Sequence, residues 1–211
     1  MTKKLVIVDY GLGNIVSAEQ SFKKVSIEKK IEAEILITNK PSDIADSTHI
    51  VLPGQGAFKS CMQGLKDISG MIEELNKSVI KNKKPFLGIC VGMQLLADHS
   101  LENGKHDGLG WIGGTINKLP SKNLKLPHMG WNTVNKVSNT GKILQSSKKN
   151  DFYFVHSYYF DCNKVSEIAG ITNYGIDFPS FISKENIYGV QFHPEKSSEQ
   201  GLSFLENFLK L

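Results

Sequence analysis

The sequence of 211 residues contains no arginine, so lysine supplies all 25 of its cationic side chains. Forked binding of phosphate and bidentate recognition of guanine both favour arginine over lysine. The lysines form scattered pairs and no dense basic stripe, although the formal net charge is +4. The composition therefore argues against a nucleic-acid-binding protein and indicates an ordinary solvated surface.

Cysteine is scarce as well, and the three copies, Cys61, Cys90 and Cys162, include no C-x-x-C pair. An odd number without such a pair argues against a disulfide framework and against a zinc knuckle. No His, Cys or carboxylate spacing matches a metal motif, so the sequence predicts neither a metal nor a cofactor. We predict that Cys61, in an expected helix, and Cys162 are inert thiols, as suits a reducing cytoplasm.

Long apolar runs and nucleotide-binding glycine patterns are also missing. No stretch approaches the roughly 20 apolar residues of a membrane span, and the apolar run after Lys4 is too short for a signal peptide. The third glycine of a dinucleotide fingerprint would fall at Val16, and no P-loop occurs. With 40% apolar and 22% charged residues, and without repeats or linkers, the chain is typical of one cytoplasmic domain over residues 1–211.

The first half of the sequence alternates between strand and helix patterns. Short apolar runs predict strands at 5–8, 31–37, 49–52 and 85–89. Helical spacing appears between them, over 15–25, from Pro41 and over 71–80. Such alternation predicts an α/β fold with an open, mostly parallel sheet and helices on both faces.

The second half changes to turns and short strands. We predict strands within 108–119 and 124–137, and at 152–156, 167–172 and 187–192. Their spacing favours antiparallel additions to the edge of the sheet. An amphipathic pattern from Leu202 to Leu209 predicts a closing helix that packs back on the sheet.

A cysteine between two glycines follows the strand at 85–89. Gly88-x-Cys90-x-Gly92 matches the G-x-S-x-G nucleophile elbow with sulfur in place of oxygen. The glycines are expected because neighbouring backbone leaves no room for a Cβ atom, and the start of the following helix favours a thiolate. A small buried cysteine in a tight strand-to-helix turn explains the motif equally well, so its partners must decide.

Two further segments supply candidate partners for Cys90. In His193-Pro194-Glu195, residues i and i+2 of an extended segment lie on one side, so Glu195 can orient the His193 imidazole. The segment 53–56 ends another strand, where two glycines let backbone N–H groups turn toward a ligand. Alone, each segment is also explained by an ordinary turn. The remaining histidines, His128 and His156 among them, are expected to be packed and hydrogen-bonded.

Taken together, these segments resemble a known family. Three blocks occur in this order: Pro53-Gly54-x-Gly56, Gly88-x-Cys90-x-Gly92-x-Gln94 and His193-Pro194-Glu195. They resemble the class I (triad) glutamine amidotransferases, which implies a flavodoxin-like fold and one type-1 domain. Further segments resemble the glutaminase subunits of imidazole glycerol phosphate synthases: Asp9-Tyr10-Gly11-x-Gly13-Asn14, Pro127-His128-Met129-Gly130-Trp131-Asn132, Phe154-Val155-His156-Ser157-Tyr158-Tyr159 and His193-Pro194-Glu195-Lys196-Ser197. The resemblance covers essentially the whole chain.

The resemblance implies a reaction and a set of residues for it. Cys90 would attack the side-chain amide of L-glutamine, His193 would protonate the departing ammonia, and Glu195 would orient His193. Hydrolysis of the thioester would then release glutamate without a cofactor. Backbone N–H groups of Val91 and of the Gly54-Gln55 segment would form the oxyanion hole. The implied substrate contacts are Gly56, Gln94, Ser157 and Tyr158.

The resemblance also implies a partner, because ammonia that reaches water is protonated and lost. That partner is a (β/α)8-barrel cyclase subunit, which uses the ammonia to form imidazole glycerol phosphate and AICAR in histidine biosynthesis. The segment 9–14 alone favours a plain β-α connector, whereas the resemblance makes it an interface in a heterodimer. The implied interface residues are Tyr10, Gly11, Asn14, Met129, Trp131 and Lys196. Charged contacts from this chain would have to use lysine.

One residue departs from the family pattern, and some alternatives remain open. Gln55 stands where the family commonly has a small apolar residue such as valine, but activity is expected to survive because the oxyanion donor is backbone. A paralogous glutaminase that feeds a nucleotide-sugar amidotransferase shares these motifs. A non-catalytic interaction subunit would not need the complete set of Cys90, His193 and Glu195. A stand-alone peptidase or esterase would have no special use for Gln94 or for the segment 53–56.

Overall fold

The computed structural model describes residues 2–120, 124–137, 143–144 and 150–211. Its main sheet has eight strands in the order β2-β1-β3-β4-β14-β13-β12-β9. The first part of this sheet is parallel and is formed by β2 (Ala33–Thr38), β1 (Lys3–Val8), β3 (His49–Gly54), β4 (Phe86–Cys90) and β14 (Ile187–Val190). The predicted α/β fold with a mostly parallel sheet is confirmed.

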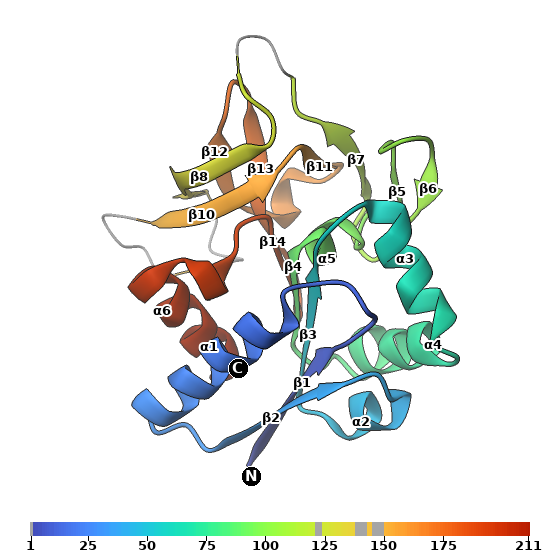
Figure 1. Ribbon diagram of the computed structural model, residues 1–211, viewed down its shortest axis with the longest axis vertical. Coiled ribbons are helices and arrows are strands. Elements are labelled where there is room, and N and C mark those ends of the chain that lie inside the picture. Colours follow the sequence, from blue (N-terminus) through green and yellow to red (C-terminus); the bar gives the residue numbers. More distant parts are fainter. Residues whose placement is uncertain (1, 121–123, 138–142, 145–149) are drawn as a thin grey trace.

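Helices cover both faces of this sheet, as predicted (Figure 1). On one face, α1 (Ile15–Glu28) packs against α6 (Ser198–Leu209), and the rings of Phe22 and Phe208 lie 6.2 Å apart. The other face carries α2 (Pro41–Asp46), α3 (Phe58–Asp67) and α4 (Met71–Leu75). The helix predicted over 71–80 begins as α4 and continues as a π-helical segment, Asn76–Lys81.

The antiparallel edge of the sheet is only partly as predicted. It consists of β13 (Asp177–Lys184), β12 (Ile168–Asn173) and β9 (Asn135–Lys136). In contrast, β14 pairs in parallel with β4 inside the sheet, so the prediction of an antiparallel strand at 187–192 is wrong. All four residues of β14 are buried, and such a continuous apolar run is typical of a central parallel strand.

Other strands of the second half leave the main sheet altogether. β10 (Asp151–His156) pairs with β8 (His128–Thr133) in a sheet of two strands. A further sheet contains β11 (Tyr158–Cys162), β7 (Gly114–Lys118), β5 (His99–Ser100) and β6 (His106–Asp107). The local sequence pattern predicted several of these strands but not their pairing partners, which contacts across long sequence distances decide. Both small sheets lie beyond the carboxyl ends of the parallel strands (Figure 1).

No helix in the described part of the chain is long and apolar enough to cross a membrane.

Candidate active site

Cys90 lies at a sharp turn between β4 and the short helix α5 (Val91–Gln94), with φ +56° and ψ −112°. A positive φ is rare for a residue with a side chain, and such strain gathers at functional sites. The flanking glycines are required by close backbone packing, as predicted. A Cβ atom on Gly88 would lie 2.5 Å from the Gly92 oxygen, and one on Gly92 would lie 1.8 Å from the Leu52 oxygen. The turn is therefore pressed tightly against β3.

His193 and Glu195 form a buried pair beside this turn. His193 Nδ1 lies 2.8 Å from Glu195 Oε1, and the two side chains are 5% and 2% exposed. The predicted contact is present, but its geometry is not the expected one. Pro194–Lys196 is a 3-10 turn rather than an extended segment. The turn is held in place because the His193 N–H donates to the Tyr153 carbonyl and the Ser197 hydroxyl donates to the His193 carbonyl.

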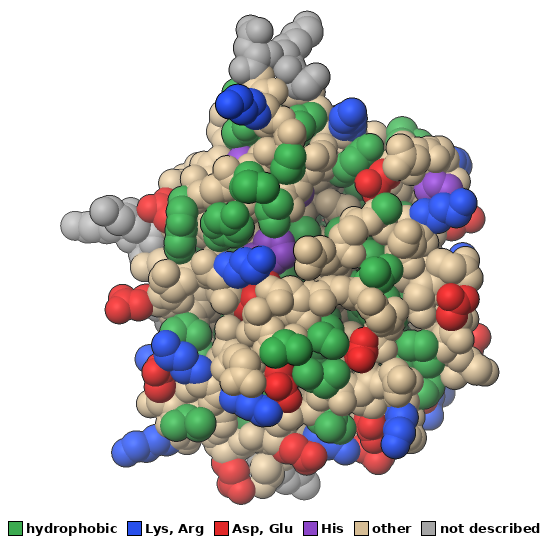
Figure 2. Space-filling view, viewed as in Figure 1, with side chains coloured by type: hydrophobic (Ala, Val, Ile, Leu, Met, Phe, Trp, Pro, Cys, Tyr) green, Lys and Arg blue, Asp and Glu red, His purple; other side chains and the backbone are tan. Residues whose placement is uncertain are grey.

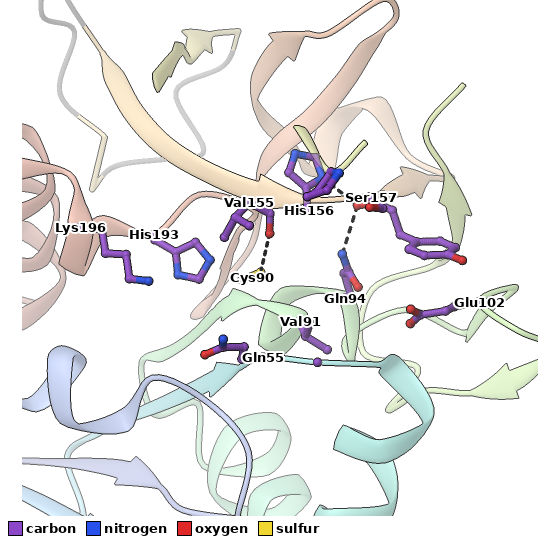
Figure 3. A pocket seen from close by; sticks show the side chains of 13 residues that line it. Gln55, Cys90, Val91, Gln94, Glu102, Val155, His156, Ser157, His193 and Lys196 are labelled. Carbon is purple, nitrogen blue, oxygen red and sulfur yellow. Dashed lines mark hydrogen bonds between the residues drawn. The ribbon is translucent and has the colours of Figure 1, made fainter. Parts of the chain in front are cut away.

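The electrostatic surroundings of His193 favour its charged form. Burial alone would lower its pKa, but the neighbouring Cys90 sulfur and the Glu195 carboxylate outweigh burial and raise the pKa to about 10. Its Nε2 atom is buried and has no hydrogen-bond partner within the described residues. His193 lies beside Cys90 in Figure 3. The arrangement places a proton carrier next to a thiol, as a cysteine hydrolase needs.

These groups face a cavity of about 270 Å³, near the lower limit for small-molecule sites. The sequence-predicted residues Gln55, Gly56, Cys90, Val91, Gln94, Ser157, Tyr158, His193 and Lys196 all line this cavity. The backbone of Gly54 pairs with Cys90 in the β3–β4 register, just below it. The structure thus brings together the elbow, the 53–56 segment and residues 157–158 at the junction of β10 and β11, which are far apart in the sequence.

Gln94 reaches across the cavity wall to the small sheets. Its Nε2 donates to the Tyr158 carbonyl at 3.2 Å (Figure 3). The same atom donates to Gln191 Oε1 at 3.0 Å. The two donor hydrogens of the amide are therefore committed to the protein. The Gln94 carbonyl oxygen remains as its acceptor for another group.

Some residues of the site belong to no motif that the sequence shows. Glu102 lines the cavity, and its Oε2 accepts the Phe58 N–H at 2.7 Å. His156 also lines the cavity, while the fully buried Gln191 lies just behind Cys90. Glu102 belongs to a polar loop without a motif, so nothing local in the sequence could have distinguished it. Gln191 directly precedes Phe192 and His193, which was a usable signal.

Two of the predicted interface residues point inward. Tyr10 is 5% exposed, and its hydroxyl donates to the Pro53 carbonyl at 2.7 Å. Burial raises the Tyr10 pKa, so the hydroxyl keeps its proton. Asn14 Nδ2 donates to Glu195 Oε1 at 3.3 Å. These two side chains therefore support the site from below, and the assignment of Tyr10 and Asn14 to a partner interface stays a prediction.

The other predicted interface residues are accessible. Gly11 and Lys196 are exposed, and Met129 and Trp131 on β8 are 62% and 55% exposed. Figure 2 shows hydrophobic side chains gathered over the region of β8 and β10. An apolar patch beside a site that opens to the surface is typical of a surface that another protein covers. Their role as an interface stays a prediction.

The 53–56 loop is held from beneath by Tyr10 and by Cys61. The Cys61 thiol donates to the Gln55 carbonyl at 3.6 Å, and burial raises the pKa of this thiol. Cys162 lies at the end of β11, and burial raises the pKa of this thiol also. Neither neutral thiol is placed for nucleophilic chemistry. The described residues contain no group of three or more His, Cys, Asp or Glu side chains that could hold a metal ion.

Comparisons with known proteins identify relatives of this chain. The family model described as glutamine amidotransferase class-I matches residues 6–211. The chain is 47% identical to the imidazole glycerol phosphate synthase subunit HisH of Pelagibacter ubique, covering 98% of this chain and 99% of that protein. It is 45% identical to subunit HisH 2 of Methanococcus maripaludis, with 98% of each chain covered. A solved structure described as a glutamine amidotransferase is 18% identical with a TM-score of 0.72, covering 96% of this chain and 98% of that one.

Proposed function

The chain belongs to the class-I glutamine amidotransferase family, and on that premise we propose that it is the glutaminase subunit of an imidazole glycerol phosphate synthase. The observation that carries the proposal is the buried His193–Glu195 pair beside Cys90 at the strained elbow. Relatives named as this subunit are 39–47% identical over 98% of the chain, which supports the acceptor pathway, histidine biosynthesis.

The reaction follows from the positions of these three side chains. The Cys90 thiolate attacks the amide carbon of glutamine, and backbone N–H groups of Val91 and of the Gly54-Gln55 segment hold the oxyanion. His193 donates its proton to the leaving ammonia, which generates a thioester. His193 then takes a proton from water, whose oxygen attacks the thioester and releases glutamate and the Cys90 thiol. Glu195 holds the tautomer of His193 throughout.

The cavity suits the zwitterionic end of glutamine. Glu102 is the acidic side chain among the described residues that line it, and it lies across Gln94 from Cys90 in Figure 3. We assign Glu102 to the substrate α-ammonium, together with the free Gln94 oxygen. Backbone N–H groups at Gly56, Ser157 and Tyr158 then hold the α-carboxylate. This arrangement leaves the side-chain amide of the substrate facing Cys90.

The product ammonia requires a second protein. We infer that a (β/α)8-barrel cyclase subunit docks over the exposed Met129 and Trp131 and near Lys196, forming a heterodimer. The cyclase would use the ammonia to make imidazole glycerol phosphate and AICAR. We also propose a cytoplasmic location, which this biosynthetic role and the free cysteines support.

The test is glutamate release by the purified chain, alone and mixed with the cyclase, with and without the cyclase's nucleotide substrate. We expect release that rises when cyclase and its substrate are both present, and none above background from Cys90→Ala. Absence of any stimulation by the cyclase would overturn the assigned pathway. A Cys90→Ala protein that keeps wild-type glutaminase activity would overturn the mechanism.

A further inference from the structure

Gln191 has no role in the reaction as derived above, yet it contacts the nucleophile. Its side chain is fully buried, and its Nε2 lies 3.7 Å from Cys90 Sγ. Its Oε1 accepts the amide of Gln94 at 3.0 Å. The backbone is also fixed, because the Gln191 N–H donates to the Ser180 carbonyl at 2.9 Å. A buried amide held at both ends has one orientation available to it.

The carbonyl of Tyr158 fixes that orientation, because a carbonyl oxygen only accepts hydrogen bonds. Gln94 must therefore present its NH2 group to Tyr158, and the same NH2 group donates to Gln191. Gln191 must accept with Oε1, so its own NH2 group points at the Cys90 sulfur. Exchanging N and O in either amide would place two donors or two acceptors against each other.

The same carbonyl is held from its other side by a second chain of hydrogen bonds. His156 Nδ1 donates to Tyr158 O at 2.8 Å, so His156 Nε2 accepts from His128 Nδ1 at 2.9 Å. His128 Nε2 then accepts from Asn132, whose orientation the Asn173 carbonyl fixes independently. The Asn173 carbonyl at one end and the Tyr158 carbonyl at the other require the same donor-to-acceptor direction for these hydrogen bonds. The position of the Tyr158 carbonyl is therefore well determined.

The sulfur of Cys90 therefore has opposed neighbours. The Val155 carbonyl lies 3.9 Å away and can accept from the neutral thiol, which favours the protonated form. The Gln191 amide donates and favours the thiolate, because a hydrogen bond to a charged acceptor is stronger than one to a neutral acceptor. Other titratable groups near the sulfur are His193, Tyr10 and Cys61, and the latter two stay neutral.

We propose that Gln191 is a positioning residue that holds an amide donor against the Cys90 sulfur and stabilises the thiolate for attack. The proposal rests on the proposed function, in which Cys90 is the nucleophile. It differs from the role of His193, which supplies charge and moves a proton. Gln191 supplies a neutral donor whose direction is set by Gln94 and Tyr158.

The test follows the rate at which iodoacetamide alkylates Cys90 as pH is varied, with the Cys90 peptide measured by mass spectrometry. Gln191→Met keeps the length of the side chain and removes the donor. We expect the midpoint of its pH profile to rise by about one unit, which is a tenfold lower rate on the acidic side. The plateau rate at high pH should not change, since access to the sulfur is the same. Gln63→Met, on the exposed side of α3, is the matched control and should keep the wild-type midpoint.

Gln191→Glu provides a second variant of nearly the same shape, in case the methionine variant folds poorly. Its carboxylate would repel the thiolate, so the midpoint should rise further than in Gln191→Met. A wild-type midpoint in either folded variant would overturn the proposal, even with reduced glutaminase activity, because removal of the donor would then have left the thiolate unaffected. Failure of the proposed function would give a different result. Cys90→Ala would then retain glutaminase activity, while Gln191→Met would still shift the midpoint of Cys90 alkylation.

Discussion

Two histidines line the same cavity at the same depth, and they are in opposite electrostatic states. His193 and His156 are 4% and 5% exposed. Burial acts on both to lower the pKa, but Cys90 and Glu195 raise that of His193 to about 10. His156 has a backbone carbonyl and His128 as neighbours, and its pKa falls to about 3. The charges of the neighbouring groups, and not the depth of burial, therefore make His193 a proton carrier and His156 a neutral structural residue.

The comparison extends outward to a pair of asparagines. Asn14 donates to the Glu195 carboxylate behind His193, and Asn132 donates to Nε2 of His128 behind His156. The first contact supports a negative charge and so favours a charged imidazole. The second requires an unprotonated Nε2 and so favours a neutral one. Asn14 thus supports the charged form of His193 through Glu195, and Asn132 supports the neutral form of His128, the neighbour of His156.

Replacing each histidine by glutamine should separate the two roles most strongly. We expect His193→Gln to lower kcat by about 10²–10⁴-fold, since it removes the general acid and base. His156→Gln should lower kcat/KM about tenfold or less, mainly through KM, because it only loosens the Tyr158 carbonyl that orients Gln94. Steady-state glutamate release in the presence of the cyclase measures both.

Thermal unfolding should confirm that both variants remain folded, and His106→Gln, in the partly exposed strand β6, serves as a matched control. Comparable losses of kcat in His193→Gln and His156→Gln would contradict the assignment of proton transfer to His193 and of a structural role to His156.

The pH dependence of stability should differ in sign between the two environments. The pKa of His193 is raised above the ordinary 6.5 to about 10. The contribution of His193 to the free energy of unfolding is therefore complete below pH 6.5 and is lost as pH rises toward 10. The pKa of His128 is lowered by burial from 6.5 to about 4, so its contribution is present above pH 6.5 and is lost as pH falls toward 4. Each proton gives a slope of about 1.4 kcal/mol per pH unit in the free energy of unfolding.

Denaturant unfolding at a series of pH values measures these slopes. Glu195→Gln should reduce the alkaline slope, part of which Cys90 also causes, and leave the acid slope intact. His128→Gln should reduce the acid slope alone, to which His156 and His49 also contribute. Slopes that are unchanged in both variants, or exchanged between them, would contradict the assignment of charge.

The asparagines should give a smaller effect. Asn14→Ala removes a long hydrogen bond to a carboxylate, worth about 1 kcal/mol, and should lower kcat about fivefold. KM for glutamine should stay the same, since Asn14 does not line the cavity. Asn132→Ala is the counterpart on the neutral side and should affect KM rather than kcat. Kinetics with saturating cyclase distinguish these outcomes, and a shared pattern would mean that the asparagines only stabilise the fold.

The sequence predicted those parts of the site that depend on local geometry. Gly88 and Gly92 were expected because the elbow excludes Cβ atoms, and the contact distances agree. The His193–Glu195 pair was found through its short spacing, although a 3-10 turn produces it. Contacts between distant segments left no local pattern. For this reason the sequence gives no functional signal for Glu102 or for the His156–His128 pair, whereas Gln191 lies directly beside the His193 motif and could have been identified.

The same reason explains the errors in the fold. Strand positions follow from the runs of apolar residues, so the parallel core was predictable from Leu5–Val8 onward. Pairing partners do not follow from these runs, and β10 joins β8 rather than the main sheet. The hydrogen bond from the Tyr10 hydroxyl to the Pro53 carbonyl was not predictable either, because it joins residues 43 positions apart in the sequence.

The smallest effect is expected at Gln55, which lines the cavity together with both histidines but whose side chain is exposed. Its carbonyl accepts the Cys61 thiol, and its N–H belongs to the segment assigned to the oxyanion. Both groups are backbone, so Gln55→Val and Gln55→Ala should each keep kcat/KM within about threefold, against 10²–10³-fold for loss of an oxyanion donor. Glutamate release with and without the cyclase and its substrate measures this. If either variant changed the stimulated rate more than tenfold while the unstimulated rate stayed constant, the Gln55 side chain would control the orientation of that peptide. The cavity would then have a third determinant of catalysis beside its charged and neutral histidines.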